Sequence, residues 1–334
     1  MNWRSQKRIV EFINEIRKSE DGLVQYHDKE KLNGILKIYI RSSSLENIEQ
    51  VEAEIKEKFK QEITIEDKEI NSLILEHRMA ARRNGFIKLY DALDSKPTKE
   101  TLVDASGREL NFLKKIIFRL YDIYLLDDSL ALLKMIREEQ LLGNKELSWE
   151  GLLTLSQRLK KFMLLFDEIE STPMKKYIFE LNKLNLFEIP EIFIIEGKEN
   201  QKWLNWEQAL ECTYKEFEKY FKYIDKVDGY VTQQGSKGLE YNNVMVIIND
   251  DEKRGNQFSF EKLFGIDELS DTDINNIRNN KDNAVSRTRR LFYVTASRAK
   301  ESLALIIYTR DMNKAKRFFI ENSLATEEEI DMEV

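Results

Sequence analysis

Residues Arg289–Lys300 read RRLFYVTASRAK, and a nearly continuous apolar run, LALIIYT (Leu303–Thr309), follows them. At 100° per residue, the first stretch forms a helical stripe that is half small residues and can pack closely against a neighbouring element. The stripe consists of Leu291, Phe292, Thr295, Ala296 and Ala299. Arg298 lies at its edge, where a cation is costly unless an anion meets it. The pattern predicts an arginine presented to phosphate; the alternative is an amphipathic helix with solvated basic residues.

The composition limits the class of protein. A chain of 334 residues is longer than one ordinary domain and shorter than three. Three prolines, 12 glycines and 34% charged residues favour long helices over sandwiches or barrels. One cysteine, Cys212, excludes a disulfide framework and fits a reducing cytoplasm. The only histidines are His27 and His77, and together with the single cysteine they are too few for a metal-ligand cluster. We therefore expect no metal site built by this chain.

Charge and hydropathy bear on the partners. No signal peptide and no membrane-length apolar run is present, which predicts a cytoplasmic protein without a membrane partner. The formal net charge of −7 argues against a protein coated with basic surface. A local basic groove stays compatible with that charge, because binding to nucleic acid depends on where the cations lie.

The first third of the chain alternates helical and strand patterns. A helical stripe from Ile9 to Ile16 precedes a predicted strand at Gly34–Ile40. Ser43 and Glu46 have the spacing of a capping box before a second helix, and Leu73–Leu75 is a second short strand. Helices alternating with strands predict one flank of a parallel α/β sheet.

Strand patterns return only near the end of the chain, after a long helical stretch from about Asn111 to Tyr223. The later strands are almost continuously apolar, as strands covered on both faces should be. They are predicted at Gly229–Thr232, Val244–Ile248 and Leu303–Tyr308. The simplest architecture is an α/β domain built from two chain segments with an all-helical domain inserted between them. The predicted limits are 1–97 and 227–334 for the α/β domain and 98–226 for the insertion.

Two further segments are predicted to contribute little to the core. Asp251–Ala284 is polar and indicates a long surface excursion. A last helix at about Met312–Asn322 precedes an acidic tail that is predicted to be frayed.

A glycine-rich loop, QQGSKGLEY (Gln233–Tyr241), connects two of the predicted strands. Its glycines can bring backbone N–H groups close to a phosphate or a nucleotide sugar. It is not a P-loop, because that motif requires GxxxxGK[ST] leading into a helix, and no such string occurs in the sequence. Taken alone, the loop is weak evidence for nucleotide binding.

The combination of motifs is far more specific, because it resembles the C-terminal half of the UvrD/Rep/PcrA-like superfamily 1A DNA helicases. TQQGSKGLEYNNV (Thr232–Val244) resembles motif V, TxHxxKGLEFxxV, and RRLFYVTASRAKESL (Arg289–Leu303) resembles motif VI, ERRLxYVAxTRAxxxL. NWRS (Asn2–Ser5) resembles motif IV, commonly NYRS. The motifs occur in the family's order, with the helical stretch between IV and V. The resemblance implies a RecA-like motor domain (domain 2A) carrying an inserted helical domain (2B).

The resemblance also implies roles for individual residues. Arg4 and Arg298 correspond to the two arginines that reach the γ-phosphate of ATP across the cleft between motor domains. Glu240 corresponds to the glutamate near the nucleotide sugar, and Gly238 lets the loop approach. The implied DNA contacts are Thr232, Gln234, Lys237, His77 and Arg78.

Departures from the family pattern limit this expectation. Gln234 replaces a histidine, and Thr288 replaces a glutamate that would pair with Arg289 or Arg290. The phosphate-binding loop, the Asp-Glu box that holds Mg²⁺ and the other early motifs are absent. ATP and Mg²⁺ are therefore expected in an intact motor, and this chain alone is expected neither to bind them tightly nor to hydrolyse ATP. The start at motif IV favours a truncated chain.

Several residues have a plain structural alternative. One of Arg289 and Arg290 is expected to brace its helix through an intramolecular ion pair. Arg82 and Arg83 are predicted to form a solvated face, and His77 is as compatible with a structural role as with a DNA contact. Trp203 and Trp206 resemble base-stacking platforms, but core packing is the preferred interpretation in a helical region.

The sequence thus predicts part of an ATP-dependent DNA helicase or translocase, with 3′ to 5′ direction by resemblance. Its expected partners are single-stranded or partly duplex DNA and an N-terminal motor half that carries motifs I to III, with a nuclease or repair protein as a further candidate. One alternative is a non-catalytic DNA- or protein-binding module derived from a helicase. Another is a subunit of a nuclease-linked or defence-system helicase.

Overall fold

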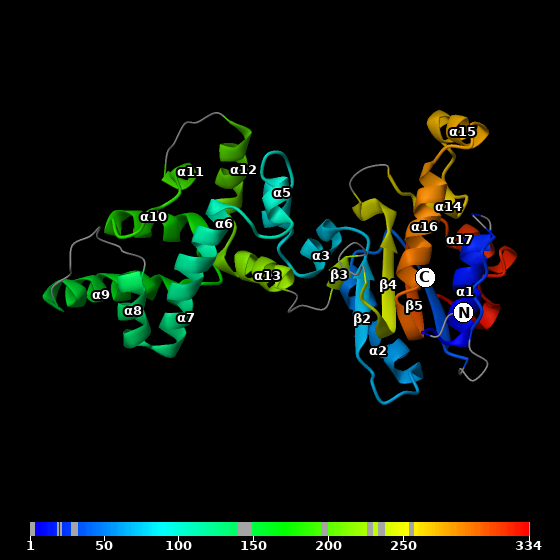
Figure 1. Cartoon of the computed structure of the whole chain (residues 1–334), viewed down its shortest axis with the longest axis horizontal. Coiled ribbons are helices and arrows are strands. Elements are labelled where there is room, and N and C mark those ends of the chain that lie inside the picture. Colours follow the sequence, from blue (N-terminus) through cyan, green and yellow to red (C-terminus); the bar gives the residue numbers. More distant parts are fainter. Residues whose placement is uncertain are drawn as a thin grey trace. The chain divides into compact units, whose positions relative to one another are not determined.

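The chain forms two compact units: residues 1–83 together with 229–334, and residues 84–228. The computed structural model describes residues 4–18, 20, 22–27, 33–138, 149–194, 200–225, 230–232, 238–253 and 257–333. We call the first unit the α/β unit and the second the helical unit (Figure 1).

The α/β unit is built on one six-stranded sheet in the order β3-β2-β4-β5-β1-β6, in which all neighbouring strands are parallel. The strands are β1 (Ile35–Ser42), β2 (Ile70–Ile74), β3 (Tyr230–Thr232), β4 (Tyr241–Asn249), β5 (Ala299–Thr309) and β6 (Ile330–Met332). Two strands come from the first chain segment and four from the second. This confirms the predicted α/β class, with a parallel sheet assembled from two separated segments.

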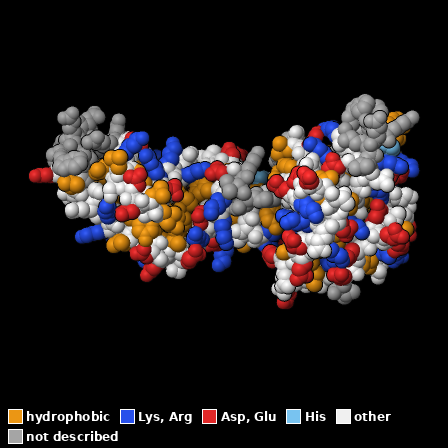
Figure 2. Space-filling view, turned by 90° about the horizontal axis from the view of Figure 1, so that it is seen from below, with side chains coloured by type: hydrophobic (Ala, Val, Ile, Leu, Met, Phe, Trp, Pro, Cys, Tyr) orange, Lys and Arg blue, Asp and Glu red, His pale blue; other side chains and the backbone are white. Residues whose placement is uncertain are grey.

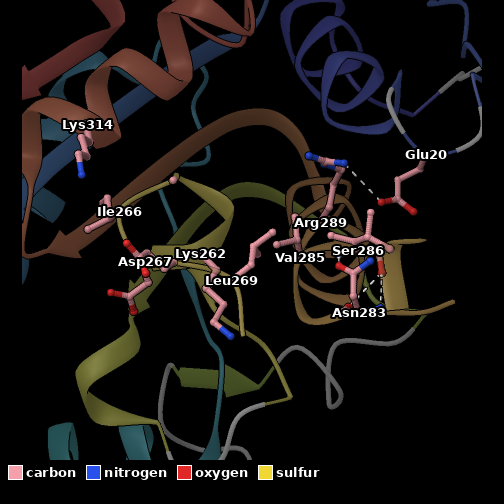
Figure 3. A pocket seen from close by; sticks show the side chains of 13 residues that line it. Glu20, Lys262, Ile266, Asp267, Leu269, Asn283, Val285, Ser286, Arg289 and Lys314 are labelled. Carbon is pink, nitrogen blue, oxygen red and sulfur yellow. Dashed lines mark hydrogen bonds and ion pairs between the residues drawn. The ribbon is translucent and has the colours of Figure 1, made fainter. Parts of the chain in front are cut away.

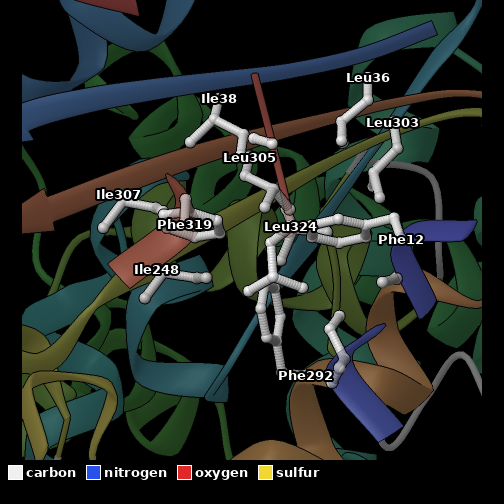
Figure 4. Close-up of a cluster of buried hydrophobic side chains, with 14 of the residues drawn as sticks. Phe12, Leu36, Ile38, Ile248, Phe292, Leu303, Leu305, Ile307, Phe319 and Leu324 are labelled. Atoms are coloured by element: carbon white, nitrogen blue, oxygen red, sulfur yellow. The ribbon is translucent and has the colours of Figure 1, made fainter. Parts of the chain in front are cut away.

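Helices cover both faces of the sheet, as parallel sheets require (Figure 1). They are α1 (Lys7–Lys18), α2 (Ile48–Glu62), α3 (His77–Arg83), η3 (Asp250–Glu252), α14 (Phe260–Leu263), α15 (Asp271–Arg278), α16 (Ala284–Ala296), α17 (Met312–Glu321) and η4 (Glu327–Glu329). On one face Phe12, Phe292 and Phe319 meet Ile38 and Leu305 of the strands (Figure 4). Phe12 and Phe292 pack edge to face at 5.6 Å, a favourable geometry for aromatic pairs. This core joins α1 and α16.

The helix α16, which carries the first part of the stretch Arg289–Lys300, is shorter than the sequence predicted. It ends at Ala296, and Ala299, expected on the same helical stripe, is the first residue of β5. The N–H groups of Ser297 and Arg298 close the last turn on the carbonyls of Tyr293 and Thr295, at 2.9 and 3.1 Å. The pairing of β5 with β4 and β1 then fixes the backbone from residue 299 onward, so sheet formation overrides the helical periodicity.

The acidic tail is not frayed as predicted, because its strand β6 pairs in parallel with β1. Its carboxylates meet buried or half-buried cations from other elements. The guanidinium of Arg41 donates to Oδ1 of Asp331 at 2.9 Å, and that of Arg8 donates to both carboxylate oxygens of Glu329 at 2.6 and 2.7 Å. The prediction failed because the tail is ordered by partners that are distant in sequence.

The stretch predicted as a surface excursion, residues 251–284, also contributes to the core. Phe260 and Phe264 are buried in the cluster that contains Phe292. Oδ2 of Asp250 accepts hydrogen bonds from the hydroxyl of Ser259 at 3.0 Å and from Lys253 at 2.7 Å, which holds the start of α14 against the end of β4. The segment is polar in composition but anchored by two aromatic side chains.

The helical unit contains only helices as regular secondary structure over its described residues. They are α4 (Ile87–Leu93), α5 (Lys99–Leu102), α6 (Arg108–Phe112), the π-helical η1 (Leu113–Phe118), α7 (Arg119–Leu126), α8 (Ser129–Glu138), α9 (Trp149–Met163), η2 (Leu164–Glu168), α10 (Met174–Leu184), α11 (Glu191–Ile194), α12 (Gln201–Leu210) and α13 (Tyr214–Ile224). Trp206 is buried, which confirms core packing for that residue. Trp203 is half-buried and lines a surface hollow of the unit.

Asp273, a buried carboxylate, ties the start of α16 to α14 and α15. Its Oδ1 accepts from the N–H of Ala284 at 3.0 Å, and its Oδ2 accepts from Lys262 and the Ser270 hydroxyl, each at 2.7 Å. Burial alone would raise the pKa of Asp273, but these hydrogen bonds hold it well below its usual range. A carboxyl whose pKa is lowered on folding stabilises the fold above its unfolded pKa, and this contribution is lost as the pH falls.

We expect Asp273→Asn to lower the free energy of unfolding of the α/β unit by about 1–2 kcal/mol at neutral pH, because it removes a charged acceptor. The difference from wild type should narrow below about pH 4, where the unfolded wild-type chain takes up a proton at this carboxyl. Urea unfolding at neutral pH and below about pH 4 measures the difference in the free energy of unfolding. Asp271→Asn is the matched control, because Asp271 is an exposed residue of the same helix, α15. An equal cost at both pH values would contradict the electrostatic origin.

Candidate functional site

Glu240 and Arg298 lie at the amino edge of the sheet, each directly before a strand. Glu240 precedes Tyr241, the first residue of β4, and Arg298 precedes Ala299, the first residue of β5. Neighbouring parallel strands that start in register place their preceding residues side by side. Here Tyr241 pairs with Ala299, and the N–H of Tyr241 donates to the carbonyl of Arg298 at 3.0 Å. The two motifs therefore meet at the backbone.

The segment before α1 brings Arg4 to the same edge. The Ser5 hydroxyl donates to the carbonyl of Ala299 at 2.9 Å, and the N–H of Gln6 donates to that of Lys300 at 2.8 Å. This path requires glycine at Gly34, because a Cβ there would lie 2.6 Å from Cβ of Gln6, and φ is +76°. The chain is thereby held beside the start of β5.

Arg4 forms an ion pair with Glu240 through its Nη1 and the Oε1 of the carboxylate. The arginine side chain is 65% exposed and that of the glutamate 25% exposed, so the pair faces solvent. An exposed ion pair contributes little to stability. It does hold together a guanidinium and a carboxylate that are 236 residues apart in the sequence.

Arg298 is held by backbone carbonyls on both sides. Its Nε donates to the carbonyl of Val294 at 3.1 Å, and its Nη1 donates to that of Leu239 at 3.3 Å. A guanidinium has five N–H donors in a fixed plane, so these two bonds orient the group and leave donors for an anion. The cation is met here by carbonyl oxygens of motifs V and VI.

Gly238 shapes the described end of the motif V loop. Its φ of +80° lies in the left-handed region that side chains disfavour, and a Cβ there would meet no atom within 4 Å. The glycine is therefore required by backbone conformation rather than by crowding. Gln234 and Lys237, which the sequence predicted to contact DNA, lie outside the described residues.

The remaining predicted DNA contacts lie at the opposite, carboxyl edge of the sheet. Thr232 ends β3 and pairs with Ile74 at the end of β2, and His77 begins α3 just after β2. Thr232 is buried, whereas His77 and Arg78 are half-buried. The structure thus divides the predicted residues into an amino-edge group, Arg4, Glu240 and Arg298, and a carboxyl-edge group, His77, Arg78 and Thr232.

Arg289 and Arg290 both form ion pairs within the chain, whereas the sequence predicted such a pair for one of them. Glu20, just beyond α1, lies 3.5 Å from Nη1 of Arg289 and 3.6 Å from Nη1 of Arg290, and Arg290 also forms an ion pair with Asp282. Thr288 stands where a glutamate was expected and is buried: its hydroxyl donates to the carbonyl of Ala284 at 2.6 Å and accepts from the N–H of Ser259 at 2.7 Å.

Arg83 corrects a prediction, because it is not on a solvated face. Its side chain is 1% exposed and forms ion pairs at 2.7 Å with both Glu52 and Glu252, which are 3% and 4% exposed. Burial opposes its charge, yet hydrogen bonds to the two carboxylates raise the pKa of Arg83. Arg82 is exposed, as predicted. The signal in the sequence was Glu52, a carboxylate on the buried stripe of α2 with Ile48, Ile55 and Phe59.

Two other kinds of site are missing from the described ranges. They contain no group of three or more His, Cys, Asp or Glu side chains able to hold a metal ion. None of their helices is both long and apolar enough to span a bilayer. On the face drawn in Figure 2, basic and acidic side chains are interspersed, so no single sign of charge coats that surface.

The chain resembles known proteins both by family and by an individual relative. The family model of the UvrD-like helicase C-terminal domain matches residues 1–310. The Gabija protein GajB of Bacillus cereus (strain HuB5-5) is 25% identical over 357 residues, which cover 93% of this chain and 49% of that protein. The chain therefore spans about half the length of this relative.

Proposed function

Because the chain belongs to the family of UvrD-like helicase C-terminal domains, we propose that it forms the second motor domain of an ATP-dependent DNA helicase or translocase. The observation that carries the proposal is the amino-edge group. Arg4, Glu240 and Arg298 come from three distant parts of the sequence, and the sheet places them together. In this proposal the helical unit is the inserted helical domain of the family.

The chemistry proposed for the amino-edge group is recognition of the γ-phosphate. ATP and Mg²⁺ would be held by an N-terminal motor half, and Arg4 and Arg298 would approach the transferring phosphoryl group from this side. Arginines act there because charge spreads over the phosphoryl oxygens in the transition state. Glu240 would accept a hydrogen bond from the nucleotide sugar and would exchange its present partner, Arg4, for it.

The carboxyl-edge group provides the proposed DNA contact. His77 and Arg78, with Gln234, Lys237 and the backbone around Thr232, would contact the phosphates of single-stranded DNA. The two groups lie at opposite edges of one rigid sheet, so a domain closure driven by ATP at one edge displaces the other edge along DNA. A 3′ to 5′ direction is proposed from the family resemblance alone.

The direct test combines this chain with a separately produced N-terminal motor half that carries the phosphate-binding loop. We expect no ATP hydrolysis by the chain alone and DNA-stimulated hydrolysis by the pair, because each half supplies part of one catalytic site. Phosphate release is measured with and without single-stranded DNA. A well-folded pair that associates but shows no activity would contradict the motor assignment and favour a non-catalytic binding module.

A second candidate function is a subunit of a nuclease-linked or defence-system helicase, and the similarity to the Gabija protein GajB is the observation that favours it. Co-expression with the products of adjacent reading frames tests this candidate. Purification of a stable complex with a nuclease would support it, and activity as an isolated motor without such a partner would argue for the first assignment.

A further inference from the structure

A hollow of about 320 Å³ in the α/β unit lies between the end of α1 and the middle of α16. We call it the arginine hollow; its lining residues are Ile16, Arg17, Glu20, Arg289, Arg290, Tyr293 and Val294. A larger hollow of about 660 Å³ adjoins it and shares Glu20 and Arg289 (Figure 3). In Figure 3 the side chains of these two residues point toward each other at the edge of the larger hollow.

The cations of the arginine hollow share few carboxylates. Glu20 serves both Arg289 and Arg290, at 3.5 and 3.6 Å, which is longer than the 2.7–2.9 Å typical of charge-assisted hydrogen bonds. The second carboxylate, Asp282, is shared between Arg290 and Arg287. Among the described residues, the three guanidinium groups of Arg287, Arg289 and Arg290 therefore share two carboxylates, Glu20 and Asp282. The site is electrostatically suited to a further anion.

Arg17 is oriented toward the same place by an aromatic ring. Its guanidinium lies 5.2 Å from the ring centroid of Tyr293, within cation–π range, and its Nη1 donates to the Tyr293 hydroxyl at 3.4 Å. The floor beside it is apolar, formed by Ile16 and Val294. Arginine and tyrosine around an apolar floor are the residue types that dominate protein–protein interfaces.

Exposed apolar side chains continue this surface. Leu23, Val24 and Tyr26 are 59%, 57% and 70% exposed, in a short segment that follows α1. The segment is anchored at the hollow, because the Gln25 side chain donates to the Tyr293 hydroxyl at 2.5 Å and its backbone exchanges two hydrogen bonds with the Asn14 side chain. The exposed apolar side chains thus belong to a segment that is held at the hollow by Gln25.

We propose that the arginine hollow binds an acidic segment of a partner protein. A carboxylate of that segment replaces Glu20 as the partner of Arg289 and Arg290, and apolar side chains of the same segment cover Val24 and Tyr26. Nucleic acid would supply the anion but no aliphatic groups for Leu23 and Val24, so a protein segment fits better. The hollow adjoins the amino-edge group at Val294, whose carbonyl accepts from Arg298, but peptide binding at the hollow does not depend on ATP hydrolysis.

The test measures fluorescence anisotropy of a short labelled peptide in which Asp or Glu alternates with Leu or Phe. The wild-type chain should bind it, and replacing the acids by their amides, or the apolar residues by serine, should weaken binding about tenfold or more. Arg290→Glu should weaken binding to a similar extent. Glu20→Gln should tighten it by about three- to tenfold, because the variant removes an internal competitor. A gain in affinity separates this mechanism from structural damage.

Lys183→Glu, an exposed charge reversal on α10 of the helical unit, serves as the matched control and should leave peptide affinity unchanged. Absence of peptide binding by the wild-type chain, or unchanged or weaker binding by Glu20→Gln, would overturn the proposal. So would single-stranded DNA binding more tightly than the peptide and losing its affinity in Arg290→Glu, which would make this a nucleic-acid surface. These readouts are independent of ATPase activity, so either proposal can fail without the other.

Discussion

Replacing Arg298 by alanine is expected to lower the DNA-stimulated ATPase rate of the motor assembled with its N-terminal half by about 10³–10⁵-fold. The guanidinium is oriented by the carbonyls of Val294 and Leu239, so its remaining donors are preorganised for a phosphoryl group. Its removal takes away stabilisation that exists only in the transition state, and kcat should fall far more than the affinity for ATP. Single-turnover hydrolysis and nucleotide binding, measured separately, show this split.

Two companion variants sharpen the result. Arg298→Lys keeps the charge but lacks the planar fork, so it should recover only a small part of the rate. Arg287→Ala, in the helix α16 that precedes Arg298, removes an arginine whose Nε donates to the carbonyl of Gln257, and it should leave hydrolysis unchanged. An unchanged kcat in Arg298→Ala would remove this residue from the proposed catalytic group.

Replacing Arg83 by methionine is expected to destabilise the α/β unit by about 3–5 kcal/mol, the cost of breaking a buried ion pair from one side. Glu52 and Glu252 would stay buried without the cation that bonds to both. The cluster joins α2, α3 and the turn after β4, so its loss should be felt throughout the unit. Chemical denaturation followed by hydrogen exchange of the β4 and β5 amides measures the effect in this unit.

The neighbouring arginine provides the matched control. Arg82 is exposed and forms an ion pair with Glu252 at 3.1 Å, so Arg82→Met should cost no more than about 1 kcal/mol. Combining Arg83→Met with Glu52→Met should restore part of the loss, because it removes the buried carboxylate that had paired with Arg83, while Glu252 keeps its ion pair with Arg82. Equal costs for the two single variants would show that burial of the cluster contributes little.

The fold was predictable where strands are nearly continuous apolar runs. Val244–Ile248 and Leu303–Tyr308 became the centres of β4 and β5, because strands buried on both faces are predominantly apolar. The predicted helix before β5 was longer than the observed one, because a stripe of small residues is equally compatible with the start of a buried strand. Only the pairing with β4 and β1 decides where the helix ends.

Two of the errors, those on Arg83 and on the acidic tail, share one physical cause, namely ion pairs between residues distant in sequence. Arg83 and the acidic tail look solvated because charged residues usually are. Their partners, Glu52 for Arg83 and Arg41 for Asp331, are supplied by other elements. Periodicity places a residue on a face of its own helix or strand, and it carries no information on which charge the fold will set opposite.

The candidate site was predictable only through the order of motifs. Nothing in the local sequence of Arg4 or Glu240 indicates that the two side chains form an ion pair, and the grouping with Arg298 follows from the register of β4 and β5. The roles of these residues in hydrolysis stay predictions for the variants described above. The arginine hollow had no sequence signal, because Glu20 and Arg289 meet through tertiary packing alone.

The position of β1 in the sheet also sets an order of events during synthesis. Both of its hydrogen-bonding neighbours, β5 and β6, are made at the far end of the chain. While the ribosome produces residues 84–228, β1 has no strand to pair with, and its apolar side chains must be kept from wrong partners. The helical unit, whose residues are contiguous, can fold first, because local contacts form quickly. The sheet is complete only when β6 has left the ribosome. Removing the residues from Ile330 onward would leave β1 as an unpaired edge strand, which favours aggregation.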